Sequence, residues 1–373
     1  MNSAYPAQSC DIDAEVIAGF ADLAKGGFEN PERVEGTVRV SVPEHPGKGF
    51  VARFGDELEV LPERATSNPN TKIVIPIATL RRIFREHEFL DWRDISIVGT
   101  IVLKGDLDLA NLFSRSCIRP DNQTIERFAA VEALHEAKGY RKLDEVERVH
   151  RPSQMQVLEA IEDGVPLVIT GLEPTPPCRD WTLTRLAEKF ADCVVRVRLA
   201  TQPQTMREFV DELEAFAENS YRGMVDKLGR PYTNGAMLPT EMRADFGPLF
   251  FDIEDFNSPQ LWLGAVPTHI PTSSLHRDPL AGFLLQVMGR KRLDLYSADQ
   301  ADLIYPMKAY NNYQPCWFRP DNPDFGIYPR AQEARCISVA LEPGELLLQP
   351  AGWFHQVYAL DSPNMSVSYF WRY

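Results

Sequence analysis

Cysteine is scarce in this 373-residue chain and forms no recognisable framework. The six cysteines are far apart in the sequence and include no C-x-x-C pair; they are Cys10, Cys117, Cys178, Cys193, Cys316 and Cys336. This pattern argues against a disulfide-stabilised secreted domain. We therefore expect a reducing, cytoplasmic compartment.

Long apolar stretches are also missing from the sequence. No run approaches the roughly 18–20 apolar residues that a membrane-spanning helix needs, so no membrane span is expected. The first residues, from Met1 to Ser9, contain no basic segment followed by an apolar core. A secretory signal is therefore not expected either.

Positive charge is in deficit. The chain has 39 lysines and arginines against 53 aspartates and glutamates, which gives a formal net charge of −14. Because proteins bind phosphate backbones through clustered cations, this balance argues against a nucleic-acid partner. Arg81, Arg82 and Arg85 could form a local basic patch, but their helical spacing is more typical of one solvated helix face.

The length predicts two domains, and the first is a small α+β accessory domain at residues 10–115. Apolar residues at helical spacing predict helices at residues 11–25 and 76–85. Alternating patterns predict strands at residues 38–42, 50–54, 58–61, 71–75 and 95–103.

One segment of this domain, Gly99-Thr-Ile-Val-Leu-Lys-Gly-Asp-Leu-Asp-Leu-Ala110, resembles the strand and helix start of the sterol-carrier-protein type-2 fold. The resemblance implies an apolar ligand enclosed between the sheet and its helices. The alternative is an accessory domain whose apolar residues fill their own core, and the sequence pattern does not distinguish the two.

Residues 116–150 are expected to form a helical linker. Residues 124–138 have helical apolar spacing, with Asp121 and Asn122 as capping candidates and Gly139 as the stop. The charged run at residues 141–151 predicts a second exposed helix or a linker.

The second domain, residues 151–373, contains the residues that indicate chemistry. His276-Arg277-Asp278 precedes the apolar run from Gly282 to Met288, and His355 follows a strand and a Pro-Ala-Gly turn. Two imidazoles and one carboxylate can occupy one face of a metal and leave the other face open, as in the non-haem Fe(II) oxygenases. The sequence therefore predicts a metal site made by His276, Asp278 and His355.

The flanking motifs resemble those of the JmjC (cupin-8) dioxygenases, and are nearest to the asparaginyl-hydroxylase type. They are Pro271-Thr-Ser-Ser-Leu-His-Arg-Asp278, Gly282-Phe-Leu-Leu-Gln-Val-Met-Gly-Arg-Lys-Arg-Leu-Asp-Leu-Tyr296, Leu341-Glu-Pro-Gly-Glu-Leu-Leu-Leu-Gln-Pro-Ala-Gly-Trp-Phe-His355 and Tyr369-Phe-Trp371. The resemblance implies a C-terminal double-stranded β-helix, a jelly-roll or cupin fold, within an α+β protein. It also implies Fe(II), with 2-oxoglutarate and O₂ as co-substrates, for hydroxylation of an unactivated C–H bond.

The same resemblance implies how 2-oxoglutarate is bound. Lys291 stands where the family places its carboxylate-binding lysine, and alternation with Leu293 and Leu295 would point it inward. Ser273 matches a hydroxyl position that assists the same carboxylate. Arg290 and Arg292 fit a solvated basic turn better, and His269 is expected to be a structural histidine.

Two positions depart from the family pattern. Many relatives have asparagine where Gly282 stands and another asparagine near Tyr369, and both amides would help to hold 2-oxoglutarate. The sequence also ends at Tyr373, directly after the last expected strand. We therefore do not expect dimerisation through the C-terminal helices that some relatives use. An oligomer formed in another way is compatible with the sequence.

We interpret the chain as an Fe(II)- and 2-oxoglutarate-dependent hydroxylase whose expected substrate is a side chain of a peptide or protein. One alternative is a hydroxylase of a small lipophilic metabolite, with the N-terminal domain as its recognition module. Another is a non-catalytic binding protein that keeps the cupin shell. The intact metal triad and Lys291 argue against this last alternative.

Overall fold

The structure is a computed structural model that describes residues 7–88, 97, 99–139, 142–173, 175–197, 202–220, 231–246 and 250–373. The chain divides into two compact units. Unit 1 comprises Met1–Ile125 and Met307–Trp317, and unit 2 comprises Glu126–Pro306 and Phe318–Tyr373. No helix in the described part of the chain is long and apolar enough to cross a membrane.

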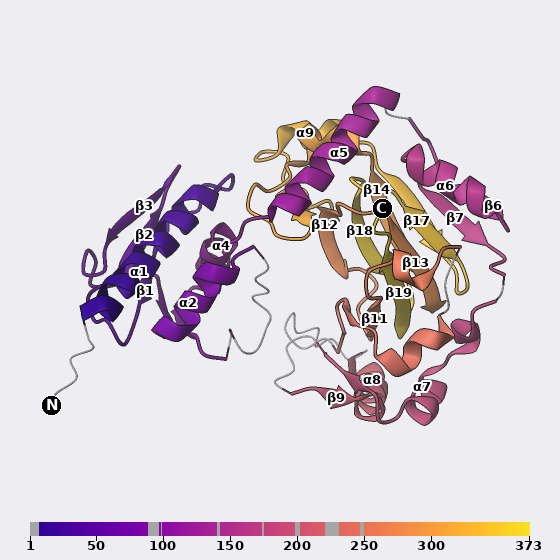
Figure 1. Cartoon of the computed structure of the whole chain (residues 1–373), viewed down its shortest axis with the longest axis horizontal. Helices are drawn as coiled ribbons and strands as arrows, with labels where there is room; N and C mark the ends of the chain where they lie inside the picture. The colour runs from indigo at the N-terminus through magenta and orange to yellow at the C-terminus, as the bar shows by residue number, and fades with distance from the viewer. Residues whose placement is uncertain are drawn as a thin grey trace. The chain divides into compact units, whose positions relative to one another are not determined.

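Unit 1 is an α+β unit with one five-stranded sheet in the order β3-β2-β1-β4-β5 (Figure 1). Its helices are α1 (Ala7–Gly27), α2 (Ile77–Glu86) and α4 (Leu107–Ser116). Its strands are β1 (Gly36–Ser41), β2 (Phe50–Phe54), β3 (Leu58–Pro62), β4 (Thr71–Val74) and β5 (Val102–Gly105), and the segment Met307–Trp317 contains β15 (Gln314–Pro315). Residues 95, 96 and 98 of the predicted strand at 95–103 lie outside the described residues.

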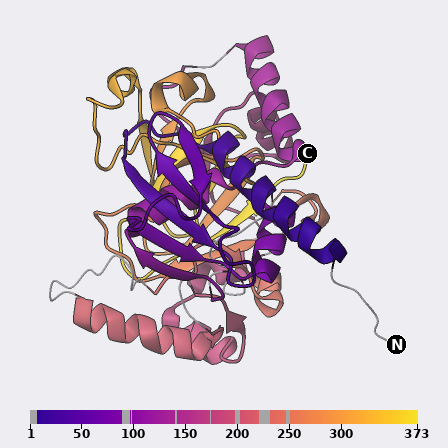
Figure 2. The ribbon, with the colours of Figure 1, turned by 90° about the vertical axis from the view of Figure 1, so that its left-hand side faces the viewer.

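The helices of unit 1 cover one face of its sheet, and alternation along the strands explains why. Val38 and Val40 of β1 are fully buried and pack in one cluster with Phe20 of α1 and Phe113 of α4. Figure 2, with the strands and α1 in indigo and purple, shows this unit from another side. The intervening residues of β1, among them Arg39, therefore lie on the other face of the sheet.

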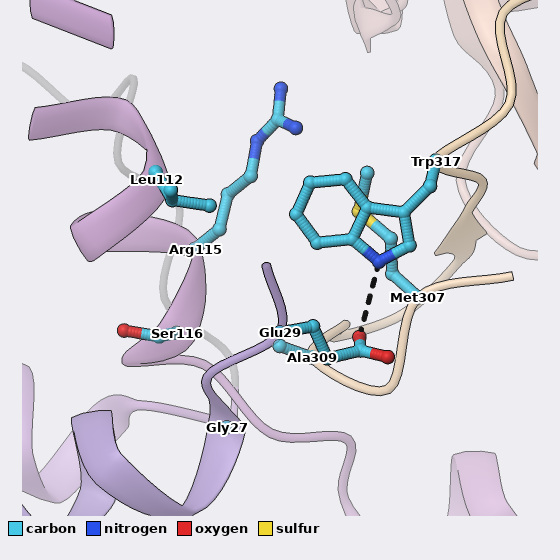
Figure 3. A pocket seen from close by; sticks show the side chains of 8 residues that line it. All are labelled: Gly27, Glu29, Leu112, Arg115, Ser116, Met307, Ala309 and Trp317. Carbon is cyan, nitrogen blue, oxygen red and sulfur yellow. Dashed lines mark hydrogen bonds between the residues drawn. The ribbon is translucent and has the colours of Figure 1, made fainter. Parts of the chain in front are cut away.

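A small cavity of about 10 Å³ lies between α4 and the segment Met307–Trp317 (Figure 3). The carboxylate of Glu29 accepts hydrogen bonds there from the indole N–H of Trp317 at 3.3 Å and from the backbone N–H of Lys308 at 2.5 Å. This cavity has room for about one water molecule. The apolar ligand implied by the sterol-carrier resemblance stays a prediction.

Unit 2 contains most of the strands. Its helices are α5 (Asn122–Lys138, which begins in unit 1), α6 (Gln154–Glu162), α7 (Leu183–Lys189), α8 (Met206–Ser220) and α9 (Ala301–Ile304), together with the 3₁₀ helices Pro177–Asp180, Thr240–Asp245, Ile253–Asp255, Ala298–Gln300 and Pro329–Glu333. Its strands are β6 (Glu147–His150), β7 (Leu167–Thr170), β8 (Val194–Val195), β9 (Gln204–Thr205), β10 (Ala236–Met237), β11 (Gln260–Gly264), β12 (Ser273–Arg277), β13 (Gly282–Met288), β14 (Lys291–Tyr296), β16 (Ile337–Leu341), β17 (Leu346–Gln349), β18 (Phe354–Ala359) and β19 (Asn364–Phe370).

Two sheets of unit 2, antiparallel apart from the pair β6–β7 at one edge, form the expected jelly roll. The larger sheet has the order β10-β11-β19-β13-β17-β7-β6, and in the smaller one β12, β18, β14 and β16 pair in that order. Leu293, Leu295 and Val357 of the smaller sheet cluster with Leu347 of the larger sheet, so the two sheets share a core. The predicted α+β class with a C-terminal double-stranded β-helix is confirmed.

Local chemistry explains several boundaries in unit 2. The side chain of Thr182 accepts a hydrogen bond from the N–H of Arg185 at 3.2 Å, so Thr182 is the N-cap of α7. Part of the charged run at 141–151, expected to be a helix or linker, is instead β6, which pairs parallel to β7. Residue 141 lies outside the described residues, and the predicted functional division at 10–115, 116–150 and 151–373 remains a proposal.

Candidate metal centre

Strands β12 and β18 bring the two predicted histidine ligands together. His276 and His355 are directly opposite each other in the antiparallel register, and their ring centroids are 4.1 Å apart. Asp278 follows the end of β12, and its Oδ2 lies 3.7 Å from Nε2 of His355. One ligand atom from each of the three residues lies within 4.8 Å of the others, so the predicted triad is a compact cluster.

Hydrogen bonds orient both imidazoles. Nδ1 of His276 lies 2.7 Å from the carbonyl oxygen of Ser274, so this nitrogen carries the proton and Nε2 keeps its lone pair. Nδ1 of His355 lies 3.4 Å from the backbone carbonyl oxygen of Trp353 and 2.6 Å from the side-chain amide of Gln349. With its proton on Nδ1, the ring donates to the carbonyl oxygen and keeps the lone pair of Nε2 for a metal, which is the usual support of a metal-binding histidine.

The electrostatics of the cluster fit a cation. Burial and the neighbouring His276 lower the pKa of His355 well below its usual value, so this imidazole is neutral. Burial raises the pKa of Asp278, and the neighbouring His276 only partly opposes that effect. A bound divalent cation would favour the ionised carboxylate and coordinate the neutral imidazoles, so the donor set fits a metal.

The turn before His355 is tied to Asp278. The backbone N–H of Gly352 donates a hydrogen bond to the carbonyl oxygen of Asp278 at 2.9 Å. Gly352 has φ of +79°, and a Cβ atom there would lie 2.7 Å from Cγ1 of Val131 on α5. Both the backbone conformation and the close approach of α5 therefore require glycine.

Arg277, between two residues of the triad, points away from the metal cluster. Its guanidinium lies between the rings of Phe128 and Phe354, 4.5 and 5.1 Å from their centroids. It also donates a hydrogen bond to the carboxylate of Glu132 at 2.9 Å. The side chain therefore links β12 to α5, because alternation along the strand directs it to the outer face of the sheet.

Lys291 begins β14 and points into the barrel. It is 2% exposed and donates a hydrogen bond to the hydroxyl of Ser366 on β19. Burial lowers the pKa of its ammonium group to about 7. Arg292, the next residue, stacks on Tyr358 with its guanidinium carbon 4.0 Å from the ring centroid. Alternation thus separates the buried lysine from the arginine on the outer face.

The other predicted positions are placed as follows. Ser273 is half-buried on β12 opposite Val357, and it makes no hydrogen bond to Lys291. Ser366 was not anticipated, although the alternation of Asn364, Ser366 and Ser368 in the last strand could have indicated it. His269 is exposed in a turn and is not part of the metal cluster.

The two departures from the family pattern have different surroundings. Gly282 lies on β13, and a Cβ atom there would meet the ring of Phe370 at an ordinary distance of 3.6 Å. Tyr369 is buried on the face of β19 opposite to Ser366 and Ser368, with its ring centroid 5.7 Å from that of Phe256. The Tyr369 side chain therefore belongs to the core outside the barrel.

Residues 152–373 match the profile of a protein family described as "Cupin-like domain". A tRNA wybutosine-synthesizing protein 5 from Danio rerio is 29% identical over 228 residues, which cover 54% of this chain and 67% of that protein. A lysine-specific demethylase 8 from Xenopus tropicalis is 33% identical over 118 residues, 32% of this chain and 26% of that protein. An HSPB1-associated protein 1 from Rattus norvegicus is 31% identical over 220 residues, 52% of this chain and 45% of that protein. These alignments thus span from about a quarter to about two thirds of each relative.

Proposed function

The chain belongs to the cupin-like domain family, as its motifs predicted, and on that premise we propose that it is an Fe(II)- and 2-oxoglutarate-dependent oxygenase that hydroxylates a C–H bond. The observation that carries the proposal is the compact cluster of His276, Asp278 and His355, whose ligand atoms lie within 4.8 Å of one another. Two imidazoles and one carboxylate are the protein ligands of non-haem Fe(II) oxygenases.

His276, Asp278 and His355 would hold the iron, which supplies the one-electron chemistry that O₂ needs to react with a C–H bond. The protein's own contribution is to fix these ligands before the metal arrives. The register of β12 and β18 sets the two imidazoles opposite each other, and the Gly352 hydrogen bond fixes the backbone of Asp278. Fixed ligands that leave part of the coordination sphere open are what a substrate-binding metal site requires.

Lys291 and Ser366 would bind the distal carboxylate of 2-oxoglutarate. Lys291 is a buried cation whose only hydrogen-bond partner among the described residues is the Ser366 hydroxyl, so a carboxylate would supply the missing negative charge. Such a carboxylate raises the pKa of the lysine again, because it favours the charged ammonium. Ser273 is a weaker candidate for the same role, from β12 of the same sheet as Lys291.

The proposed substrate is a side chain of a peptide or protein. Support comes from the aligned relatives named lysine-specific demethylases. A second candidate substrate is an RNA, because relatives named tRNA wybutosine-synthesizing protein 5 align over 54–61% of this chain. Extraction of an apolar guest from the purified protein would instead favour a small lipophilic metabolite as the substrate.

The test is turnover of 2-oxoglutarate to succinate with added Fe(II), compared between the native chain and three single variants. His276→Ala, Asp278→Ala and His355→Ala should each abolish succinate formation and lower the bound iron, while the circular dichroism spectrum is retained. His269→Ala is the matched control, because this exposed histidine lies outside the cluster. Native turnover and iron content in all three triad variants would disprove the assignment.

A further inference from the structure

The face of the unit 1 sheet opposite the helices carries a row of positive charge. Arg39 of β1 is directly opposite Lys72 of β4, and Lys72 is directly opposite Lys104 of β5. We call Arg39, Lys72 and Lys104 the basic row. We propose that the basic row and the pocket beside it bind the phosphate backbone of an RNA.

Two of the three residues of the basic row, Lys72 and Lys104, have no partner among the described residues that would stabilise their charges. Neighbouring strands lie about 4.7–4.9 Å apart, and like charges directly opposite each other destabilise a sheet. Lys72 and Lys104 are both exposed, and neither makes an ion pair or a hydrogen bond with any residue that the structure describes. A polyanion across the three strands would convert this repulsion into attraction.

A surface pocket of about 310 Å³ continues the basic row at Arg39. It is lined by Arg39, Ser41, Gly47, Glu63, Arg64, Thr66 and Ser67. The segment after β3 forms one side of the pocket, since its Thr66 carbonyl accepts a hydrogen bond from Arg39. The Nε atom of Arg39 is buried and has no hydrogen-bond partner among the described residues.

The one carboxylate that lines the pocket, Glu63, is bonded to neutral donors and forms no ion pair with the arginines. Glu63 accepts hydrogen bonds from the hydroxyl of Ser41 at 2.6 Å and from the backbone N–H of Gly49 at 3.0 Å. Neither Arg39 nor Arg64 forms an ion pair with it or with another described residue. The pocket therefore offers two guanidinium groups and several hydroxyls, which is the donor set that oxyanions bind.

The arrangement favours an RNA backbone over a single anion or an acidic peptide. Four cations on three strands and one connecting segment need a ligand with charges at regular intervals, and a phosphate backbone provides one per nucleotide. Peptide recognition usually adds buried apolar or aromatic anchors, which the basic row does not supply. With no aromatic side chain in the row or the pocket, the contacts would be to phosphates and not to bases.

The net charge of −14 does not prevent such binding. Exposed charges more than about 8 Å apart are largely screened at physiological salt, so a local row acts independently of distant carboxylates. The net charge of the whole chain argued against a nucleic-acid partner because it contains no information on where the charges lie on the surface. The inference is also independent of the proposed oxygenase, since binding is measured without iron or 2-oxoglutarate.

The experiment measures binding of a fluorescein-labelled transfer RNA to the full chain by fluorescence anisotropy over a series of salt concentrations. The double variant Lys72→Glu with Lys104→Glu should bind roughly ten- to a hundredfold more weakly at low salt. The neutral double variant Lys72→Gln with Lys104→Gln should lower the salt slope by about one unit per lysine. Both lysines are exposed, so folding is expected to be retained in both variants.

The matched control is Lys25→Glu with Arg115→Glu, which makes the same charge change on the helical side of unit 1, in α1 and α4. It should bind RNA nearly as well as the native chain. Equal losses in the control and in the Lys72 and Lys104 variants would overturn the proposal, as would native RNA binding in all of them. Tighter binding of a labelled polyglutamate peptide than of RNA would also overturn it.

Discussion

Gly352 donates its backbone N–H to the carbonyl oxygen of Asp278 at 2.9 Å, so the turn before one metal-ligand candidate is bonded to another candidate. The two segments are joined although β13, β14, β16 and β17 separate them in the sequence. Because α5 approaches this turn through Val131, the same glycine links the metal cluster to a helix outside the barrel.

Gly352→Ala should therefore destabilise the protein by about 2–5 kcal/mol, from the left-handed backbone conformation and from overpacking against Val131. Gly344→Ala is the matched control, because Gly344 has φ of +90° but no atom within 4 Å of a Cβ atom. This control should lose only about 1–2 kcal/mol. Urea unfolding would measure both variants, and equal losses would show that the Val131 contact is unimportant. Adding Val131→Ala should recover part of the stability lost in the Gly352→Ala variant, but none of the stability lost in the Gly344→Ala variant.

Lys291→Ala should weaken 2-oxoglutarate binding by roughly 10- to 150-fold. The estimate corresponds to about 1.5–3 kcal/mol for a hydrogen bond to a charged group that is left without its partner. Arg292→Ala is the control, because its guanidinium stacks on Tyr358 on the outer face. Calorimetric titration of 2-oxoglutarate into metal-loaded protein checks the prediction. An unchanged affinity in the Lys291 variant would assign the carboxylate to another cation.

The affinity for 2-oxoglutarate should fall as the pH rises above about 7. Burial lowers the pKa of free Lys291 to about 7, so the lysine is progressively neutral above that pH. Binding of a carboxylate requires the ammonium form, so the affinity should decrease by up to about tenfold per pH unit with proton uptake on binding. Titrations at pH 8 in two buffers of different ionisation enthalpy measure this uptake. Lys291→Arg should bind with little pH dependence, because arginine stays protonated.

A chain that starts at Pro120 should keep metal binding and substrate-independent turnover of 2-oxoglutarate but lose most hydroxylation of its true substrate. The triad and Lys291 all lie in unit 2, whereas unit 1 is proposed to serve recognition. This shortened chain should also carry Met307→Ser and Trp317→Ser. Both side chains belong to unit 1 and line a cavity with residues that the shortened chain lacks.

A chain that starts at residue 141 would lack α5, and with it Glu132 and the Phe128 ring that hold Arg277. It should therefore bind the metal more weakly than the chain that starts at Pro120, as measured by iron content after dialysis. Full hydroxylation of substrate by the Pro120 chain would exclude the recognition role of unit 1.

Much of the metal site was readable in the sequence because its signals are local. His276-x-Asp278 lies at the end of one strand and His355 follows a Pro-Ala-Gly turn, so residue type and turn chemistry were enough to indicate a metal. Alternation along β14 likewise separated Lys291 from Arg292, because successive side chains in a strand point to opposite faces. The strand and helix periods also predicted the α+β class.

Other features were decided only by the tertiary structure, because they depend on residues that are distant in the sequence. The partner of Lys291 is Ser366 in the last strand, and its position follows from how the two sheets face each other. The guanidinium of Arg277 stacks against Phe128 of α5, a contact that no local sequence pattern indicated.

The basic row of unit 1 was invisible in the composition for the same reason. Arg39, Lys72 and Lys104 are ordinary isolated cations in the sequence, and strand pairing alone places them side by side. Periodicity determines which face of a strand a residue occupies, whereas the strand order and register determine which charges become neighbours.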